Sequence, residues 1–229
     1  VIVLTYNNLA FTEACLFSVE AYSQYRNLEL IVVDNASTDG SREWLRRWAD
    51  EPSAAGHRRR LVLNDANLGF SAGNNVGLAA ATGDLLVMLN NDTYVTPGWV
   101  RGLCNHLWRE PGLGLVGPVT NNIGNEARIT IQYTDMPAMI REAGARTRRH
   151  AGLRYPLRTA AFFCVAMRQA TYEAIGPLDE AFGLGFFEDD DYCRRVERAG
   201  LGIACAEDVF VHHHLSASFD ALKAERRQA

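Results

Sequence analysis

Oxygen-bearing side chains gather at the tip of one apolar segment, where Asn90, Asn91 and Asp92 follow the run Leu85–Leu89. Mg²⁺ and Mn²⁺ prefer carboxylate, carbonyl and water oxygens, and they often take only one or two protein carboxylates beside substrate phosphates. This tip predicts a divalent-metal site at Asp92, with Asn91 among the nucleotide-binding candidates. A turn that ends a strand is the alternative, because Asn and Asp are common in turns.

A second acid, Asp34, follows the apolar run 28–33. In α/β folds, an acid at the carboxyl end of a parallel strand can hydrogen-bond a nucleoside. A turn or helix-capping role is an equal alternative in a segment where Asp39 and Ser41 are typical of caps. From spacing alone, both interpretations stay open.

Gly69, Gly73 and Gly77 are spaced four apart, so on a helix they share one face and allow another backbone to approach closely. Neither the dinucleotide pattern GxGxxG nor the phosphate-loop pattern GxxxxGK[ST] is present. Tight packing of a helix on a sheet is therefore the favoured role of the glycines. Asn67 and Asn74, in the same stretch, are better ligand candidates.

Four consecutive acids, 188–191, predict a general base. Crowded carboxylates hold protons more tightly, which suits proton abstraction near neutral pH. The alternative is structural, because acids in the first turn of a helix interact favourably with its dipole. Asp191 can also pair with Arg194 or Arg195 at helical spacing.

Three histidines, 212–214, end the last apolar run. Side chains alternate between the faces of a strand, so His213 is expected to point away from the other two and the three cannot share one metal. A single histidine satisfied in the core or at the surface is the more common arrangement.

Strand and helix patterns alternate through the first 92 residues, which predicts parallel strands joined by right-handed crossovers and an α/β fold. The expected strands are 1–4, 28–33, 60–63, 84–92, 114–119, 159–167 and 203–214. The expected helices are 11–25, 41–49, 71–81, 97–109, 169–175 and 189–199. Segment 121–158 is rich in arginine, and we expect loop or mobile helix there, with 141–158 as an acceptor-side or lid loop.

The composition of the 229 residues narrows the function. The net charge is −4 and the pI is about 5.9, which argues against binding nucleic acid. No apolar run reaches the roughly 18 residues that span a bilayer. Five scattered cysteines without a CxxC pair predict reduced, mostly buried thiols and therefore a cytoplasmic protein. A location at the cytoplasmic face of a membrane is the alternative.

The sequence begins inside an apolar strand, so we expect a single domain, 1–229, excised from a longer chain. Its nucleotide-binding half would cover about 1–119 and its acceptor-binding half about 120–219. Any membrane contact would come through parts absent from this sequence.

The order of these motifs resembles family 2 glycosyltransferases, closest to the rhamnosyltransferase-like branch, over residues 1 to about 219. The motifs are Thr5-Tyr-Asn-Asn, Val32-Val-Asp-Asn-Ala-Ser-Thr-Asp-Gly, Asn67-Leu-Gly-Phe-Ser-Ala-Gly-Asn-Asn, Leu89-Asn-Asn-Asp-Thr, Gly176-Pro-Leu-Asp-Glu, Phe187-Glu-Asp-Asp-Asp-Tyr-Cys-Arg-Arg and Val211-His-His-His-Leu-Ser-Ala-Ser-Phe.

The resemblance implies the GT-A nucleotide-diphosphosugar transferase fold, with a mostly parallel central sheet and helices on both faces. It implies an inverting transfer from a UDP- or dTDP-linked sugar to a saccharide or lipid-linked glycan in cell-surface polysaccharide synthesis, with Mn²⁺ or Mg²⁺ as cofactor.

The resemblance also implies roles for single residues. Thr5, Tyr6, Asn7 and Asp34 would hold the base and ribose, with Asn67 and Asn74 near the nucleotide. Asp92 would bind the metal, and His213, two residues after Val211, would be the later metal or diphosphate ligand. Asp189, paired with Glu188, would be the general base. Asn90 departs from the acid usual at the first metal position, and an amide coordinates more weakly.

Two other functions fit parts of the pattern. An inactive domain of the same fold could bind a nucleotide sugar or dock a partner, although the joint presence of Asp92, Asp189 and His213 disfavours it. A nucleotidyltransferase also combines a parallel sheet with a metal, but it usually carries a Gly-rich basic loop where this chain has Thr5-Tyr-Asn-Asn.

Overall fold

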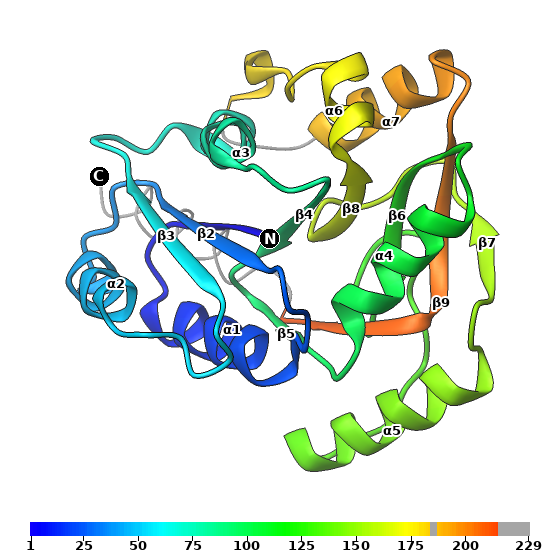
Figure 1. Cartoon of the computed structure of the whole chain (residues 1–229), viewed down its shortest axis with the longest axis horizontal. Coiled ribbons are helices and arrows are strands. Elements are labelled where there is room, and N and C mark those ends of the chain that lie inside the picture. Colours follow the sequence, from blue (N-terminus) through cyan, green and yellow to red (C-terminus); the bar gives the residue numbers. More distant parts are fainter. Residues whose placement is uncertain (184–186, 215–229) are drawn as a thin grey trace.

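The computed structural model describes residues 1–183 and 187–214. Its central sheet has the strand order β3-β2-β1-β4-β8-β6-β9-β5, with β7 paired to β9 (Figure 1). The strands are β1 Ile2–Thr5, β2 Glu29–Asp34, β3 Arg58–Leu63, β4 Leu85–Asn90, β5 Thr93–Val95, β6 Leu113–Val119, β7 Arg154–Pro156, β8 Cys164–Arg168 and β9 Gly202–His213. The helices are α1 Leu9–Tyr22, α2 Ser41–Asp50, α3 Gly69–Ala80, α4 Trp99–Arg109, α5 Met136–Arg149, α6 Gln169–Ile175 and α7 Glu188–Arg198, with a 3-10 turn at Glu180–Phe182.

The first four strands of the sheet, β3, β2, β1 and β4, are all parallel. β1 lies in the middle, with Thr5 opposite Asp34 on one side and Leu4 opposite Asn90 on the other. The apolar runs are buried as continuous strands, as expected when helices cover both faces of a parallel sheet. The carboxyl ends of these strands therefore meet at one edge, which brings the polar tips after β1, β2 and β4 together.

The second part of the sheet mixes directions. β8 runs antiparallel to both β4 and β6, whereas β6 and β9 are parallel. β9 is twelve residues long: its first part pairs with β6 and β7, and its last part, 211–213, pairs antiparallel with β5. Figure 1 shows β9 passing beside β6 and then turning across to β5. This path carries the histidines to the tip that follows β4.

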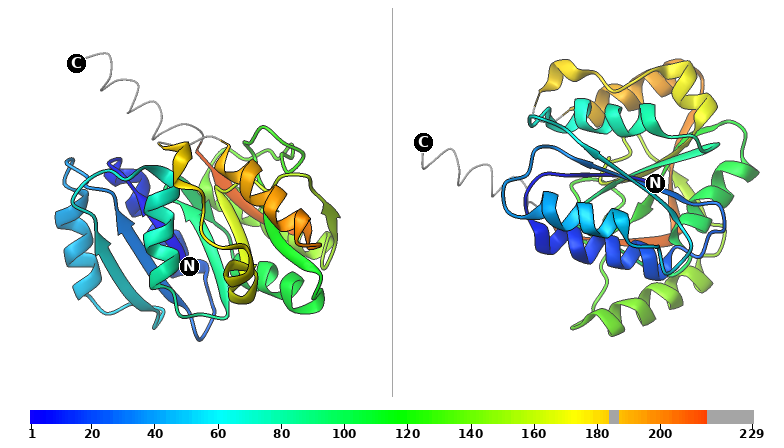
Figure 2. Two further views of the ribbon diagram at one scale, coloured as in Figure 1. Left: turned by 90° about the horizontal axis from the view of Figure 1, so that it is seen from above. Right: turned by 60° about the vertical axis from the view of Figure 1, so that its left-hand side comes forward.

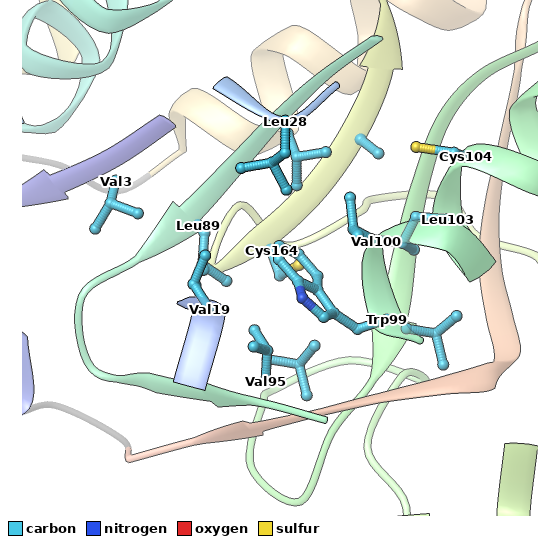
Figure 3. Packing of buried hydrophobic residues seen from close by; sticks show 14 of the residues in the cluster. Val3, Val19, Leu28, Leu89, Val95, Trp99, Val100, Leu103, Cys104 and Cys164 are labelled. Carbon is cyan, nitrogen blue, oxygen red and sulfur yellow. The ribbon is translucent and has the colours of Figure 1, made fainter. Parts of the chain in front are cut away.

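Helices cover both faces of the sheet, as the GT-A fold requires. In the right-hand view of Figure 2, α1 and α2 (blue) lie on one side of the sheet and α3, α6 and α7 on the other. Each side has its own buried apolar cluster. In Figure 3, Trp99 of α4 lies among Val95, Val100 and Cys164, and its Nε1 donates to Ser23 Oγ at 2.8 Å.

Most expected elements are confirmed, with ends shifted by at most three residues. The expected strand 159–167 is shorter and begins at Cys164, and β5 was not expected. The five cysteines are free and buried, which confirms the prediction of buried thiols. In the part of the chain that the structure describes, no helix is long and apolar enough to cross a membrane.

The expectation of a loop over 141–158 is wrong. Residues up to Arg149 belong to α5, and 154–156 form β7. α5 is held on β9, because Arg146 Nε donates to the carbonyl of Glu207 at 3.0 Å and Thr147 donates to the carbonyl of Asp208 at 2.8 Å. Only Met139 and Ala143 of this helix are buried, so its apolar stripe is too narrow to stand out among the arginines.

Candidate functional site

Asp92 and His213 meet at the carboxyl edge of the sheet. Nε2 of His213 lies 3.4 Å from Oδ1 of Asp92, and the two side chains are 9% and 7% exposed. The pairing of β5 with β9 brings them together, since Thr93 lies opposite His213 and the amide of His214 donates to the carbonyl of Asp92 at 2.9 Å.

The ring of His213 is held from two sides. Its Nδ1 lies 3.1 Å from the carbonyl oxygen of Asn122, and because a carbonyl can only accept, Nδ1 must donate. The ring stacks on Phe163 with centroids 4.8 Å apart and an angle of 15°. A neutral ring in this tautomer carries its lone pair on Nε2, which faces Asp92.

His212 and His214 lie on the opposite face of β9 from His213, which confirms the alternation expected for a strand. Their rings are 4.1 Å apart. His212 Nδ1 is hydrogen-bonded to the hydroxyl of Tyr133, and His214 packs on Phe11. Burial, with a smaller contribution from the neighbouring histidines, lowers the pKa of His212 to about 4, so this ring is neutral at neutral pH.

The donors at Asp92 fit a divalent cation. Oδ1 of Asp92 has no hydrogen-bond partner among the described residues, and a buried carboxylate oxygen without a donor is costly unless something positive binds it. A carboxylate oxygen is the kind of donor that Mn²⁺ and Mg²⁺ prefer, and the imidazole of His213 adds a nitrogen donor beside it. Within 1–183 and 187–214, no group of three or more Asp, Glu, His or Cys residues could hold a metal. A cation here would therefore need further ligands from a substrate.

Asp34 is fully buried at the end of β2. Its Oδ2 accepts from the amide of Ser37 at 3.1 Å and lies 3.2 Å from Nη1 of Arg42. Its Oδ1 has no hydrogen-bond partner in the described part of the chain. Asp34 thus closes a turn, as one interpretation expected, and its Oδ1 is a buried acceptor without a hydrogen-bond partner among the described residues.

Asn7 lies beside that turn. Its backbone is left-handed, with φ 53°, its amide donates to Ser37 Oγ at 2.7 Å, and its Oδ1 accepts from the amide of Thr38 at 2.8 Å. The loop after β1 and the loop after β2 are therefore bound to each other. Tyr6, next to Asn7, is half-buried.

Thr5 and Asn91 lie in the interior. Nδ2 of Asn91 donates to the hydroxyls of Thr5 at 3.2 Å and of Thr12 at 2.9 Å, and the two hydroxyls are 2.8 Å apart. All three residues are buried. These side chains join β1, α1 and the tip after β4, which fixes the position of Asp92.

Asn67 and Asn74 make local contacts at α3. Oδ1 of Asn67 accepts from the amide of Gly69 at 3.0 Å and from Nδ2 of Asn35 at 3.2 Å. Nδ2 of Asn74 donates to the carbonyl of Phe70 at 3.0 Å, and Asn74 is buried. Asn67 therefore helps to begin α3 at the same edge of the sheet as Asp34.

The glycines of α3 have the packing role that their spacing predicts. A Cβ at Gly77 would lie 2.4 Å from Cγ2 of Ile2, and a Cβ at Gly73 would lie 2.6 Å from Cδ1 of Leu4. Both neighbours belong to β1, so α3 lies too close to the sheet for any side chain at these positions.

Asp189 lies in the first turn of α7, next to the buried Glu188. Burial raises the pKa of Asp189 above its ordinary value, although its Oδ1 accepts from the amide of Asp190 at 2.9 Å. Asp189 lines a cavity of about 880 Å³. The other lining residues are Ile123, Gly124, Asn125, Glu126, Arg158, Thr159, Ala161, Asp190, Arg194, Glu197 and Arg198.

An ion pair anchors the helix that carries Asp189. Arg195 Nε contacts Oδ2 of Asp191 at 2.8 Å, which confirms the pairing expected from helical spacing. The same guanidinium donates to the carbonyls of Ile175 and Pro177 and lies over the ring of Tyr192, 4.6 Å from its centroid. The acid cluster is thus partly structural.

Sequence reasoning missed Asn121 and Asn75. Asn121 contacts the backbone of His213, and Asn75 hydrogen-bonds both the amide and the carbonyl of Leu178. One signal could have found Asn121: it follows an apolar strand just as Asn90 does.

A second, larger cavity, of about 1160 Å³, lies against α1 and α2 and is lined by Phe17, Trp44 and Trp48 among others. It contains none of the candidate site residues. Size alone therefore does not identify the site in this chain.

Comparison with known proteins decides the family. The family described as Glycosyl transferase family 2 matches residues 1–176. The chain belongs to glycosyltransferase family 2. The matched region includes Asp34 and Asp92, whereas Asp189 and His213 lie beyond it.

Relatives of this family 2 chain include a named glycosyltransferase and an O-antigen biosynthesis protein. It is 26% identical to glycosyltransferase AglE of Haloferax volcanii, covering 99% of this chain and 70% of AglE. It is 26% identical to the O-antigen biosynthesis protein RfbC of Myxococcus xanthus, covering 88% of this chain and 16% of RfbC. It is also 28% identical to the uncharacterized protein y4gI of Sinorhizobium fredii, of which it spans only 24%.

Solved structures share the GT-A fold with this family 2 chain. GalNAc-T7 with UDP, GalNAc and Mn²⁺ aligns with a TM-score of 0.72 at 14% identity, over 93% of this chain and 43% of that one. Mannosyltransferase PcManGT of Pyrobaculum calidifontis, with GDP-Man and Mn²⁺, aligns with a TM-score of 0.69 at 22% identity, over 99% of this chain and 60% of that one. The expected fold is confirmed.

Proposed function

We propose that this family 2 domain transfers a sugar, with inversion, from a nucleoside diphosphate sugar to a hydroxyl of a saccharide or lipid-linked glycan. The observation that carries this proposal is the buried pair Asp92–His213 at the carboxyl edge of the sheet, beside the loops after β1 and β2. The relatives support a nucleotide-sugar donor, since UDP, GDP-Man and UDP-GlcNAc are bound in similar folds.

The donor would lie along that edge. Oδ1 of Asp34, which lacks a partner among the described residues, is an acceptor suited to a base or ribose hydroxyl. The neighbouring turns at Asn7 and Asn67 bring further polar groups to the same edge. A UDP- or dTDP-linked sugar is the donor that the motif resemblance favours.

Asp92 and His213 would hold Mn²⁺ or Mg²⁺ on the diphosphate. When bound, such a cation stabilises the negative charge that develops on the departing diphosphate. The two side chains are suited to this task because they are buried and fixed by β5–β9 pairing, and because the carboxylate of Asp92 is the kind of ligand that these cations prefer.

Asp189 would be the general base. It would take the proton of the acceptor hydroxyl while that oxygen forms the new bond to the anomeric carbon. The bond from that carbon to the diphosphate breaks at the same time, and the nucleoside diphosphate leaves with the electron pair. Attack from the face opposite the leaving group inverts the anomeric centre. The raised pKa of Asp189 suits the carboxylate to this work.

The cavity that Asp189 lines is our candidate for the acceptor site. Its walls combine carboxylates, guanidinium groups and residues 123–126, which suits a ligand rich in hydroxyl groups. A saccharide placed there would present a hydroxyl to the carboxylate of Asp189.

The experiment is a thermal-shift screen of nucleotide sugars with and without Mn²⁺. A ligand that binds the native state raises the melting temperature by mass action. We expect a stabilised midpoint with one nucleotide sugar and Mn²⁺ together, followed by release of its nucleoside diphosphate when glycan acceptors are added. Binding without any turnover on a broad acceptor panel would instead favour an inactive nucleotide-sugar-binding domain.

A further inference from the structure

Asn121 continues the sheet beyond the end of β6 by means of its side chain. The ladder between β6 and β9 ends at Val119, opposite Phe210. Three residues further along β9, the amide of His213 donates to Oδ1 of Asn121 at 2.9 Å, and Nδ2 of Asn121 donates to the carbonyl of His213 at 3.2 Å. The carboxamide thus takes the place of a peptide group of a neighbouring strand.

The same segment fixes the ring of His213. The carbonyl of Asn122 accepts from Nδ1, which leaves Nε2 as the nitrogen that faces Asp92. A hydrogen bond to one ring nitrogen determines which nitrogen remains available as a ligand. Asn121 and Asn122 are adjacent, so the contact to the backbone of His213 also sets the distance between Nδ1 and its acceptor.

We propose that Asn121 is a positioning residue for the metal site: it holds His213 so that Nε2 points at Asp92. This inference rests on the proposed function, because it requires that Asp92 and His213 bind a cation. Asn121 itself need not touch the cation, the nucleotide or the reacting atoms.

A purely structural role for Asn121 makes a different prediction, and the chain offers a matched control. Asn125 lies in the same segment, donates from Nδ2 to the carbonyl of Thr159 at 3.0 Å and accepts from the amide of Ala127 at 3.1 Å. Like Asn121, it donates to one backbone carbonyl and accepts from one backbone amide, but its contacts are with residues other than His213. Asn125→Ala therefore reports the cost of loosening the segment without releasing His213.

The experiment titrates Mn²⁺ into wild type, Asn121→Ala and Asn125→Ala and follows free Mn²⁺ by electron paramagnetic resonance. Each titration is run with UDP, GDP and dTDP, and the tightest pair for wild type is used for the variants. We expect Asn121→Ala to weaken Mn²⁺ binding by roughly 10- to 100-fold, as for other groups that orient a metal ligand. The Mn²⁺ affinity of Asn125→Ala should stay within about twofold of the wild-type affinity.

The outcomes separate the two proposals. Wild type that binds Mn²⁺ with none of the three nucleotides overturns the proposed metal site. Suppose instead that wild type binds Mn²⁺. If Asn121→Ala then has the same Mn²⁺ affinity, or if both variants lose affinity to the same extent, the positioning role alone is overturned. If Asn121→Ala does not fold, ¹⁵N spectra of wild type still test the idea: we expect His213 protonated on Nδ1, and a ring protonated only on Nε2 would contradict it.

Discussion

Oδ1 of Asp92 faces Nε2 of His213 at 3.4 Å, in a place where the described residues offer that oxygen no hydrogen-bond donor. Two electron-rich atoms in this arrangement repel each other unless a proton or a cation lies between them. The pairing of β5 with β9 holds them there. A cation at this position would relieve the repulsion, as the proposed metal-assisted sugar transfer requires.

Replacing Asp92 by Asn should weaken binding of Mn²⁺ with a nucleoside diphosphate at least about tenfold, because an amide is a poorer ligand than a carboxylate. Asp84→Asn is the matched control, since Asp84 is exposed and precedes the same strand. Calorimetry on both variants measures the effect. Equal losses of affinity in the two variants would contradict the role of Asp92 as a metal ligand.

Replacing Asp189 by Asn should lower kcat by roughly 10²- to 10⁴-fold, the usual contribution of a general base. Affinity for the nucleotide should stay nearly unchanged, because the cavity that Asp189 lines includes neither Asp92 nor His213. Asp190→Asn is the control: its Oδ1 accepts from the hydroxyl of Thr159, and an amide oxygen can still accept. Retained turnover in Asp189→Asn would remove it as the base.

The pH dependence follows from the pKa of Asp189, which burial raises above 3.8. The base must be deprotonated to act, so kcat/KM should fall as the pH decreases through this raised pKa. The acid limb of the pH profile of kcat/KM should therefore lie at a higher pH than an ordinary aspartate would give. This limb should be absent from the pH profile of the residual activity of Asp189→Asn. An unchanged limb in that variant would assign it to another group.

The same shift has a consequence for stability. A carboxyl whose folded pKa is raised favours the folded state below its unfolded pKa, and that contribution is lost as the pH rises through the folded pKa. At neutral pH the ionised Asp189 therefore disfavours folding, and Asp189→Asn should be at least as stable as wild type. Urea unfolding of both proteins at pH 7 and at pH 4 tests this. The difference in free energy of unfolding between Asp189→Asn and wild type should be smaller at pH 4.

Gly77→Ala should destabilise the fold by about 1–3 kcal/mol, because its Cβ would lie 2.4 Å from Cγ2 of Ile2 in β1. Gly144→Ala is a matched helical control, since its Cβ would meet only the end of the Arg148 side chain at 3.5 Å. That variant should gain roughly 0.5–1 kcal/mol from the better helix propensity of alanine. In denaturant unfolding, the free energy of unfolding should fall below that of wild type for Gly77→Ala and rise above it for Gly144→Ala.

Apolar runs and their polar ends were enough to predict the first half of the fold. Buried parallel strands show as continuous apolar runs, and turn-forming residues mark their ends, so the positions of Asp34 and Asp92 at one edge follow from the sequence. The spacing of Gly73 and Gly77 likewise indicated close packing of α3 on β1. These features are local, and a single sequence records them.

Long-range partners could not be predicted in the same way. α5 buries only Met139 and Ala143, and β5 and β7 are three residues each, so none of them has a strong periodic pattern. The role of Asn91 was also hidden, because its bonds to Thr5 and Thr12 exist only after β1 and β4 pair. Asn121 acts on His213 through a contact that no spacing rule describes.

Calorimetry of nucleoside diphosphate binding, with Mn²⁺ and with a chelator, tests the central claim most directly. UDP, dTDP and GDP are titrated into wild type and into Asp92→Asn. We expect that one of them binds wild type in Mn²⁺, that the chelator abolishes or strongly weakens this binding, and that Asp92→Asn loses most of the difference between Mn²⁺ and chelator. Equal affinity with Mn²⁺ and with chelator would contradict it.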